Sequence, residues 1–180
     1  NVTGRYKTVD PGESIACFAL GDDHLYKTLS ETHSCRIMPA SYTNDPFIIA
    51  RQDHMISVNT ALEMDLTGQI CSESIGAVQW SGTGGASDFA FGALHSKGGR
   101  GIIAFSSTAK GGTISRIKVT LTPGAAVSIS RNLADTIVTE YGVAELRGRS
   151  VRERADALIA IAHPNFREEL REGARKLGYL

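Results

Sequence analysis

The residues with the clearest potential for chemistry form a glycine-rich run near the middle of the chain. Gly82, Gly84 and Gly85 fall within four positions, and the pair Asp88-Phe89 follows them. Glycine permits positive φ angles and lets another group come close to the backbone. The exposed N–H groups of such a loop can bind a phosphate or the oxygen of a reacting acyl group. A tight turn that only packs closely explains the same pattern equally well.

Other polar residues near predicted turns could take part in binding or catalysis. Asn44 precedes Asp45-Pro46, a typical helix start, so capping alone would explain the asparagine. Glu140 lies just past a predicted strand, where functional residues are enriched, although a surface or capping role is also open. Lys97 and Lys110 each precede a pair of glycines and could hold a phosphate as point charges. A solvated surface position is the default for both lysines.

Several well-known kinds of site are not supported by the sequence. The segment 82–87 lacks the third glycine of a dinucleotide-binding fingerprint, and no acidic residue follows at the distance expected for a ribose contact. The sequence also lacks a Walker A motif, because Lys97 and Lys110 precede their glycine pairs, whereas the lysine of that motif follows a glycine. No Gly-x-Ser-x-Gly motif is present, which argues against a serine hydrolase. The five histidines and three cysteines are scattered, so we expect no metal site.

Length, charge and cysteine content bound the class of protein. The 180 residues suffice for one domain with its own core, and the 19 basic residues balance the 19 acidic ones. A net charge of zero gives no general attraction to nucleic acid. No apolar run approaches the ~18 residues that a membrane span needs. An odd number of cysteines without a Cys-x-x-Cys pair favours reduced thiols, and therefore a cytoplasmic location.

The hydrophobic pattern predicts alternating strands and helices. We expect strands over 14–20, 35–38, 55–65, 102–105, 114–119, 126–129 and 136–139, with a hairpin that turns at Gly68. We expect helices over 24–29, 88–95 and 151–162, and others that start at Pro46 and Pro164. These elements predict a single α/β domain over residues 1–180, with a mostly parallel or mixed sheet and helices on its faces.

A series of motifs supports a family resemblance. The motifs are Tyr42-Thr43-Asn44-Asp45-Pro46, Glu63-Met64-Asp65-Leu66-Thr67-Gly68-Gln69, the glycine-rich run from Ser81 to Phe89, Ser96-Lys97-Gly98-Gly99, Ser107-Thr108-Ala109-Lys110-Gly111-Gly112-Thr113, and Thr139-Glu140-Tyr141-Gly142-Val143-Ala144-Glu145-Leu146-Arg147-Gly148. Together they resemble the C-terminal domain of the acetyl-CoA hydrolase/transferase family, and within it the 4-hydroxybutyrate CoA-transferase type. The resemblance runs from Phe18 to Tyr179. Each motif is weak alone, and their shared order makes the resemblance specific.

The resemblance implies catalytic roles for several of the candidate residues. Gly84 would donate to the oxyanion of the reacting acyl group, and Gly82 and Gly85 would shape its loop. Asn44 would orient the thioester or the acid substrate. Glu140 would be an auxiliary carboxylate near the pocket for the acid.

Other candidates are implied to bind CoA or the substrate. Lys110 would lie near the nucleotide part of CoA, and Lys97 is a weaker candidate for the same contact. Glu73 matches a carboxylate position in the family's Asn-Ala-Glu-Ser segment. Here that segment begins with Cys71, so the usual asparagine is missing. This departure could alter substrate preference, or the thiol could simply fill the space.

By the same resemblance, the expected activity is CoA transfer between a short acyl-CoA (acetyl-, butyryl- or 4-hydroxybutyryl-CoA) and an acetate-like carboxylic acid. Transfer would pass through a glutamyl anhydride and a glutamyl-CoA thioester. The CoA thioester would be a substrate, with no tightly bound cofactor. The nucleophilic glutamate would lie upstream of Asn1, in an N-terminal catalytic half. We therefore expect the isolated chain to be inactive and the full-length protein to be a homo-oligomer.

Three alternatives stay open at this point. In an acetyl-CoA hydrolase, water would attack the same glutamyl intermediates. A non-catalytic CoA-binding module would keep the glycine-rich loop without needing Asn44 and Glu140 together. A purely structural or assembly domain would expose apolar surface for its partner and could self-associate.

Overall fold

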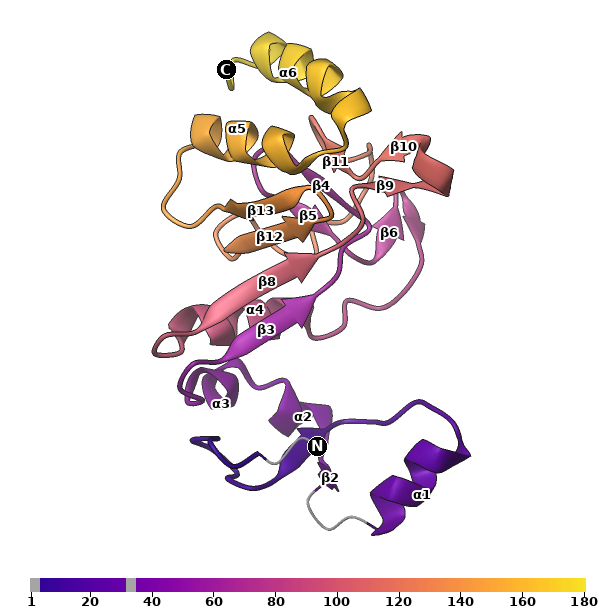
Figure 1. Cartoon of the computed structure of the whole chain (residues 1–180), viewed down its shortest axis with the longest axis vertical. Coiled ribbons are helices and arrows are strands. Elements are labelled where there is room, and N and C mark those ends of the chain that lie inside the picture. The colour runs from indigo at the N-terminus through magenta and orange to yellow at the C-terminus, as the bar shows by residue number, and fades with distance from the viewer. Residues whose placement is uncertain (1–3, 32–34) are drawn as a thin grey trace.

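The computed structural model describes residues 4–31 and 35–180, which form an elongated molecule (Figure 1). A small unit built from β1 (Ser14–Ala16), β2 (Cys35–Ile37) and α1 (Asp23–Glu31) lies at one end, and helices α5 (Val151–Ile161) and α6 (Arg167–Lys176) lie at the other. A four-stranded sheet stands between the two ends, and α4 (Ala86–His95) lies behind it in this view.

Short strands and helices alternate along the described chain. The helices are α1 (Asp23–Glu31), α2 (Ala40–Thr43), α3 (Pro46–Ala50), α4 (Ala86–His95), α5 (Val151–Ile161) and α6 (Arg167–Lys176), with 3₁₀ turns η1 (Lys110–Gly112) and η2 (Pro164–Phe166). The strands are β1 (Ser14–Ala16), β2 (Cys35–Ile37), β3 (Ile56–Asn59), β4 (Glu63–Asp65), β5 (Ile70–Cys71), β6 (Ser74–Ile75), β7 (Val78–Gln79), β8 (Arg100–Ala104), β9 (Thr108–Ala109), β10 (Ile114–Ser115), β11 (Ile117–Lys118), β12 (Thr136–Thr139) and β13 (Gly142–Glu145).

The central sheet has the strand order β13-β12-β8-β3. Strands β3, β8 and β12 run parallel, and β13 returns antiparallel beside β12. One face of this sheet presents Ile103, Ile137 and Ala144 to a core that also receives Met64 and Leu158. Burying each large apolar side chain contributes roughly 1.5–3 kcal/mol, so this core holds the sheet, β4, α4 and α5 together. The predicted mixed α/β class is confirmed.

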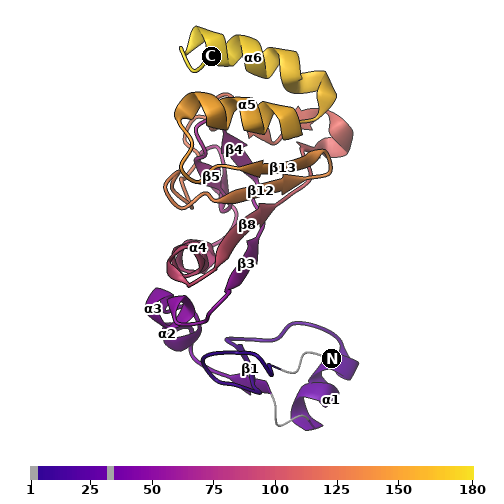
Figure 2. The same cartoon turned by 60° about the vertical axis from the view of Figure 1, so that its left-hand side comes forward.

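The opposite face of the central sheet is largely bare. On it, Ile56 and Val58 of β3 are 52% and 64% exposed, and Val143 of β13 is 59% exposed. The strand register places Ile102 and Val138 on the same face. Figure 2 shows α4 on one side of β3 and β8, while no helix of the described chain covers the other side. Helices therefore lie on only one face, although parallel sheets are usually covered on both.

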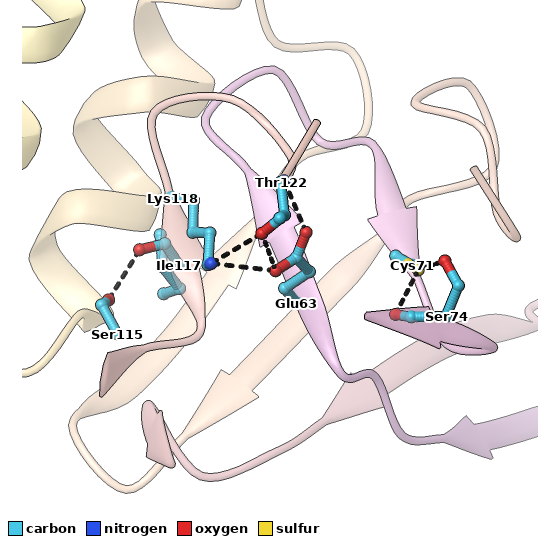
Figure 3. Close-up of polar contacts among 7 residues, drawn as sticks. All are labelled: Glu63, Cys71, Ser74, Ser115, Ile117, Lys118 and Thr122. Carbon is cyan, nitrogen blue, oxygen red and sulfur yellow. Dashed lines mark hydrogen bonds and ion pairs between the residues drawn. The ribbon is translucent and has the colours of Figure 1, made fainter. Parts of the chain in front are cut away.

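A partly buried ion pair joins two strands and a loop beside the core (Figure 3). The Lys118 Nζ lies 3.0 Å from the Glu63 Oε2, and the Glu63 side chain is only 8% exposed. The N–H and hydroxyl of Thr122 also donate to the Glu63 carboxylate, at 2.7 and 2.8 Å. Because Glu63 lies on β4, Lys118 on β11 and Thr122 in the following loop, this cluster fixes where that loop runs.

Several predicted elements are confirmed with their local causes. The Asp22 carboxylate accepts a hydrogen bond from the Leu25 N–H and so helps to start α1. Gly68 turns the β4–β5 hairpin at φ +98°. Helix α5 begins with a capping box in which the Ser150 hydroxyl and the Glu153 carboxylate each bind the backbone N–H of the other. Hydrogen bonds from Ser150 lower the pKa of Glu153.

The segment 55–65 was predicted as one strand and is two strands in different sheets. Strand β3 pairs with β8, whereas β4 pairs with β11 and β5. Between them, Ala61 is buried and the Leu62 N–H donates to the Cys71 carbonyl at 2.8 Å. All three residues of β4 are buried, so the alternation ends with β3. Alternating side chains do not say which sheet a strand joins, and the one-strand prediction was wrong.

Other boundaries also differ from the prediction. The segment 14–20 is not a buried strand, because β1 ends at Ala16 and Phe18 and Leu20 are exposed. The segment 126–129 forms only an isolated bridge between Ile70 and Ile129. Helix α4 starts at Ala86, with Gly85 in the N-cap position, rather than at residue 88. Strand β13 was not predicted. Within the described ranges, the helices are too short or too polar to cross a membrane.

Candidate active site

The carboxyl ends of three parallel strands define one edge of the central sheet. Strands β3, β8 and β12 point the same way in Figure 1, and ligands of open α/β sheets bind at such edges. The opposite edge holds the turn between α4 and β8, where the His54 N–H donates to the Lys97 carbonyl and the Arg100 N–H donates to the Met55 carbonyl. Since α4 ends at that turn, its N-terminus and the glycine-rich loop lie toward the carboxyl edge.

The glycine-rich loop presents unobstructed backbone at the start of α4. Gly84 has φ +60°, a conformation that favours glycine, and an added Cβ would meet no atom within 4 Å. A Cβ at Gly82 would also lie in open space. Among the described residues, none accepts a hydrogen bond from the N–H of Gly82 or Gly84. No side chain caps α4, so the loop offers free donors beside the positive end of a helix dipole.

Asn44 lies directly against this loop. A Cβ added to Gly85 would stand 2.2 Å from the Asn44 Nδ2, so the amide occupies the space that glycine leaves free. The Asn44 Oδ1 accepts a hydrogen bond from the Thr43 hydroxyl at 2.9 Å. The Asn44 side chain does not cap α3, because the carboxylate of Asp45 accepts the N–H groups at the start of that helix. The structure thus brings Asn44 and the glycine-rich loop together.

A close helix crossing produces this contact. A Cβ at Gly92 of α4 would lie 2.3 Å from the Ile49 Cγ2 and 3.2 Å from the Pro46 carbonyl oxygen of α3. Glycine at this position lets the two helices approach, which places the residue just before α3 beside the N-terminus of α4. No periodicity in the sequence announces this role of Gly92, because glycine within a helix is ordinarily unfavourable.

The Asp45 cap gives a test of how firmly α3 is held. We expect Asp45→Ala to lower the free energy of unfolding by about 1 kcal/mol, because the Phe47 and Ile48 N–H groups lose their acceptor. Urea unfolding of the chain would measure the change. Asp45→Asn, which keeps an acceptor oxygen, should cost much less. Equal losses in the two variants would contradict a capping role.

Glu73 and Cys71 are both buried shortly before the glycine-rich loop. The Glu73 carbonyl accepts the N–H groups of Trp80 and Ser81, and its buried carboxylate accepts from the Gln79 amide at 3.2 Å. The Cys71 thiol is buried and donates to the Ser74 carbonyl at 3.2 Å, as Figure 3 shows. The Cys71 thiol thus has protein neighbours and is closed to solvent.

Glu140 lies on the tight turn between β12 and β13, just past the carboxyl edge. Its two carboxylate oxygens accept hydrogen bonds from the Ser107 N–H at 2.8 Å and the Ser107 hydroxyl at 2.7 Å. Burial raises the pKa of Glu140, but these bonds, with its own N–H and the nearby His163, outweigh burial and lower the pKa below its ordinary value. Glu140 is therefore ionised at neutral pH. The sequence interpretation assigned no role to Ser107, which lies 33 residues away in the chain.

The two candidate lysines occupy different edges. Lys110 begins η1, in the β9–β10 hairpin, which lies beyond the carboxyl end of β8 in Figure 1, and Lys110 is exposed. Lys97 lies in the turn between α4 and β8, at the opposite edge. The structure does not bring Lys97 to the glycine-rich loop. In the described part of the chain, no cluster of three or more His, Cys, Asp or Glu side chains could hold a metal ion.

Comparisons with known proteins agree with this geometry. The family described as "Acetyl-CoA hydrolase/transferase C-terminal domain" matches residues 21–174. The chain is 49% identical to a succinyl-CoA:cyclohexane-1-carboxylate CoA transferase of Geobacter metallireducens, over 98% of this chain and 40% of that protein. It is 47% identical to a 4-hydroxybutyrate coenzyme A transferase of Clostridium kluyveri, over 97% of this chain and 41% of that protein.

A solved structure shares the whole described architecture. The crystal structure of RipA from Yersinia pestis superposes with a TM-score of 0.93 at 43% identity, covering 99% of this chain and 40% of that one. The chain thus spans about 40% of the length of the relatives it matches. On the strength of the family match over residues 21–174 and these identities, the chain belongs to the acetyl-CoA hydrolase/transferase family.

Proposed function

We propose that this chain is the C-terminal half of an acyl-CoA:carboxylate CoA-transferase that uses short acyl-CoA and an acetate-like acceptor. The observation that carries the proposal is the contact between Asn44 and the glycine-rich loop at Gly85. It places a carboxamide beside backbone N–H groups that have no protein acceptor among the described residues. These are the groups that a tetrahedral acyl intermediate requires.

The reaction splits one transfer into four balanced additions and eliminations. A glutamate carboxylate attacks the thioester carbonyl, the C–S bond breaks, and CoA thiolate leaves an acyl-glutamyl anhydride. The thiolate then attacks the glutamyl carbonyl, which releases the first acid and forms a glutamyl-CoA thioester. A second carboxylate reverses both steps and departs as the new acyl-CoA.

The residues of this chain would stabilise those steps. Each addition places negative charge on a carbonyl oxygen, and the Gly84 N–H would donate to it. One such donor is worth about 3 kcal/mol of barrier lowering. Asn44 would hold the reacting carbonyl or acid in position, with Glu140 at the neighbouring strand end. Lys110 would pair with a phosphate of CoA.

The nucleophile itself is proposed to lie outside this chain. Near its start, Glu13 pairs with Arg36 at 2.6 Å and Glu31 pairs with Lys27 at 3.9 Å, so each of these carboxylates already has a cationic partner. We therefore propose that a preceding N-terminal half supplies the glutamate and that this chain alone transfers no CoA. The CoA thioester is a substrate in this scheme, and no resident cofactor is needed.

Trapping the thioester intermediate tests the proposal. The complete reading frame that encodes this chain would be expressed, incubated with acetyl-CoA or butyryl-CoA, and reduced with borohydride, which converts a glutamyl thioester into an alcohol. We expect mass spectrometry to locate one reduced glutamate before residue 1 of this chain, and acetate to receive CoA. The 180-residue chain alone is the matched control and should be unmodified. Binding of CoA without any trapped residue would instead support a binding module, and loss of acyl groups only to water would support a hydrolase.

A further inference from the structure

We propose that Ser107 is a positioning residue that holds Glu140 ionised and correctly oriented for the substrate. The inference rests on the proposed function, because it assigns Glu140 a contact with the substrate. It extends that function by naming the side chain on which Glu140 depends and the chemistry that Glu140 can offer.

Ser107 is a rigid double donor. It lies in the short connection between β8 and β9, and 0% of its surface is exposed. Its carbonyl accepts the Arg116 N–H at 2.8 Å, which fixes the backbone from the far side. Its N–H and its hydroxyl donate to the two oxygens of the Glu140 carboxylate, at 2.8 and 2.7 Å. Glu140 itself is an exposed residue, so these two bonds, and not burial, hold its carboxylate in one orientation.

The turn that carries Glu140 is also held from other directions. The Thr139 hydroxyl donates to the Ile161 carbonyl at 2.6 Å and accepts the Tyr141 N–H at 3.1 Å. The Tyr141 ring stands edge-on to the His163 ring, with centroids 5.3 Å apart. The residues on either side of Glu140 are thus fixed, which leaves the carboxylate with one defined position at the carboxyl edge.

This arrangement decides what Glu140 can do chemically. Hydrogen bonds to the charged form favour a carboxylate over the neutral acid. An ionised carboxylate accepts hydrogen bonds and cannot donate one. Because Ser107 uses one lone pair of each oxygen, the remaining lone pairs can accept an N–H or O–H of the substrate. Glu140 is therefore assigned to an N–H or O–H donor of the acyl-CoA, and not to the acceptor acid, whose carboxylate it would repel.

A titration of the 180-residue chain tests the inference without any assay of transfer. The Glu140 carboxyl carbon would be followed by NMR from pH 2 to pH 7, and Glu140→Gln would identify its signal. We expect Ser107→Ala to move the Glu140 midpoint to higher pH. Ser107→Cys, which nearly keeps the volume but weakens the donor, should move it in the same direction. Thr113→Ala, which removes an exposed hydroxyl that bonds the Lys110 carbonyl, is the matched control and should leave it unchanged.

Kinetics of the complete protein supply the second test. We expect Ser107→Ala to lower kcat/KM by about 10- to 100-fold, as losses of outer supporting contacts do at other sites, and to move the acid limb of its pH profile to higher pH. Ser107→Thr, which keeps the hydroxyl, should restore most of the rate and the original limb. A Glu140 midpoint that does not respond to Ser107→Ala or Ser107→Cys would overturn the inference. The inference would also be overturned if the rate of Ser107→Ala fell only in step with its melting temperature while the acid limb of its pH profile stayed in place. A wild-type protein that transfers no CoA would instead refute the proposed function.

Discussion

Replacing Gly85 with alanine should lower kcat/KM for CoA transfer by about 100-fold while the chain stays folded. The new Cβ would stand 2.2 Å from the Asn44 Nδ2 and 3.0 Å from its Cγ, so the carboxamide must move by an ångström or more. A displacement of this size in a positioning group can cost about 100-fold in rate. Alanine itself tolerates the backbone of Gly85, whose φ is −101° and ψ is 9°. The damage should therefore fall on Asn44 and spare the fold.

The chain offers a matched control three residues earlier. Gly82→Ala adds the same methyl group within the same loop, but this methyl would meet no protein atom within 4 Å. Steady-state kinetics of the complete protein, with melting temperatures for each variant, would separate the two changes. We expect Gly82→Ala to retain most activity, or to lose it only through a raised KM for acyl-CoA. Full activity in Gly85→Ala would show that the Asn44 contact does not serve the reaction.

Removing the amino group of Lys118 should destabilise the chain far more than breaking an exposed ion pair. In Lys118→Met, the Glu63 carboxylate keeps both Thr122 donors but loses the cation 3.0 Å away, within a site where its side chain is only 8% exposed. Breaking one side of a buried pair costs about 3–5 kcal/mol in general. Because the Lys118 side chain is 29% exposed, we expect a smaller loss of about 2 kcal/mol.

A variant that removes both charges gives this prediction its control. Glu63→Gln combined with Lys118→Met removes both charges, and the glutamine can still accept from Thr122, so the double variant should be more stable than Lys118→Met alone. Lys27→Met, which breaks an exposed pair with Glu31, should change stability by less than about 0.5 kcal/mol. Urea unfolding would give all three values. A Lys118→Met variant as stable as Lys27→Met would mean that Glu63 is adequately satisfied by Thr122.

The sequence predicted those parts of the fold whose causes are local. The helices predicted over 24–29 and from Pro46, the Gly68 turn and the final helices all depend on residues within a few positions of each other. The division of 55–65 between two sheets depends on distant pairing, such as that of Met64 with Ile117, and no local pattern reveals it. The fold class was therefore predictable, whereas the strand partners were not.

The candidate site could likewise be predicted only where its residues stand in local motifs. Asn44 and the glycines carry recognisable motifs, so resemblance could assign them roles in advance. Ser107 stands in one of those motifs, but its partner Glu140 lies in another, and only the packing of β8 beside β12 joins them. The two lysines illustrate the same limit, because a lysine before two glycines looks the same at either edge of a sheet. Only the direction of the strands shows that Lys97 and Lys110 lie toward opposite edges.

Because one face of the central sheet is bare, the stability of this chain depends on whether another polypeptide covers that face. Any polypeptide that covers β3 and β8 in the folded state, and ignores the unfolded one, adds RT ln(1 + [L]/Kd) to the free energy of unfolding. A partner concentration a hundredfold above Kd would add about 2.7 kcal/mol to the free energy of unfolding. The melting temperature would then rise with the concentration of the covering partner. A covering polypeptide that is covalently attached to this chain is present at a constant, high local concentration. The chain would therefore unfold together with that polypeptide when the two are joined, and by itself when it is free.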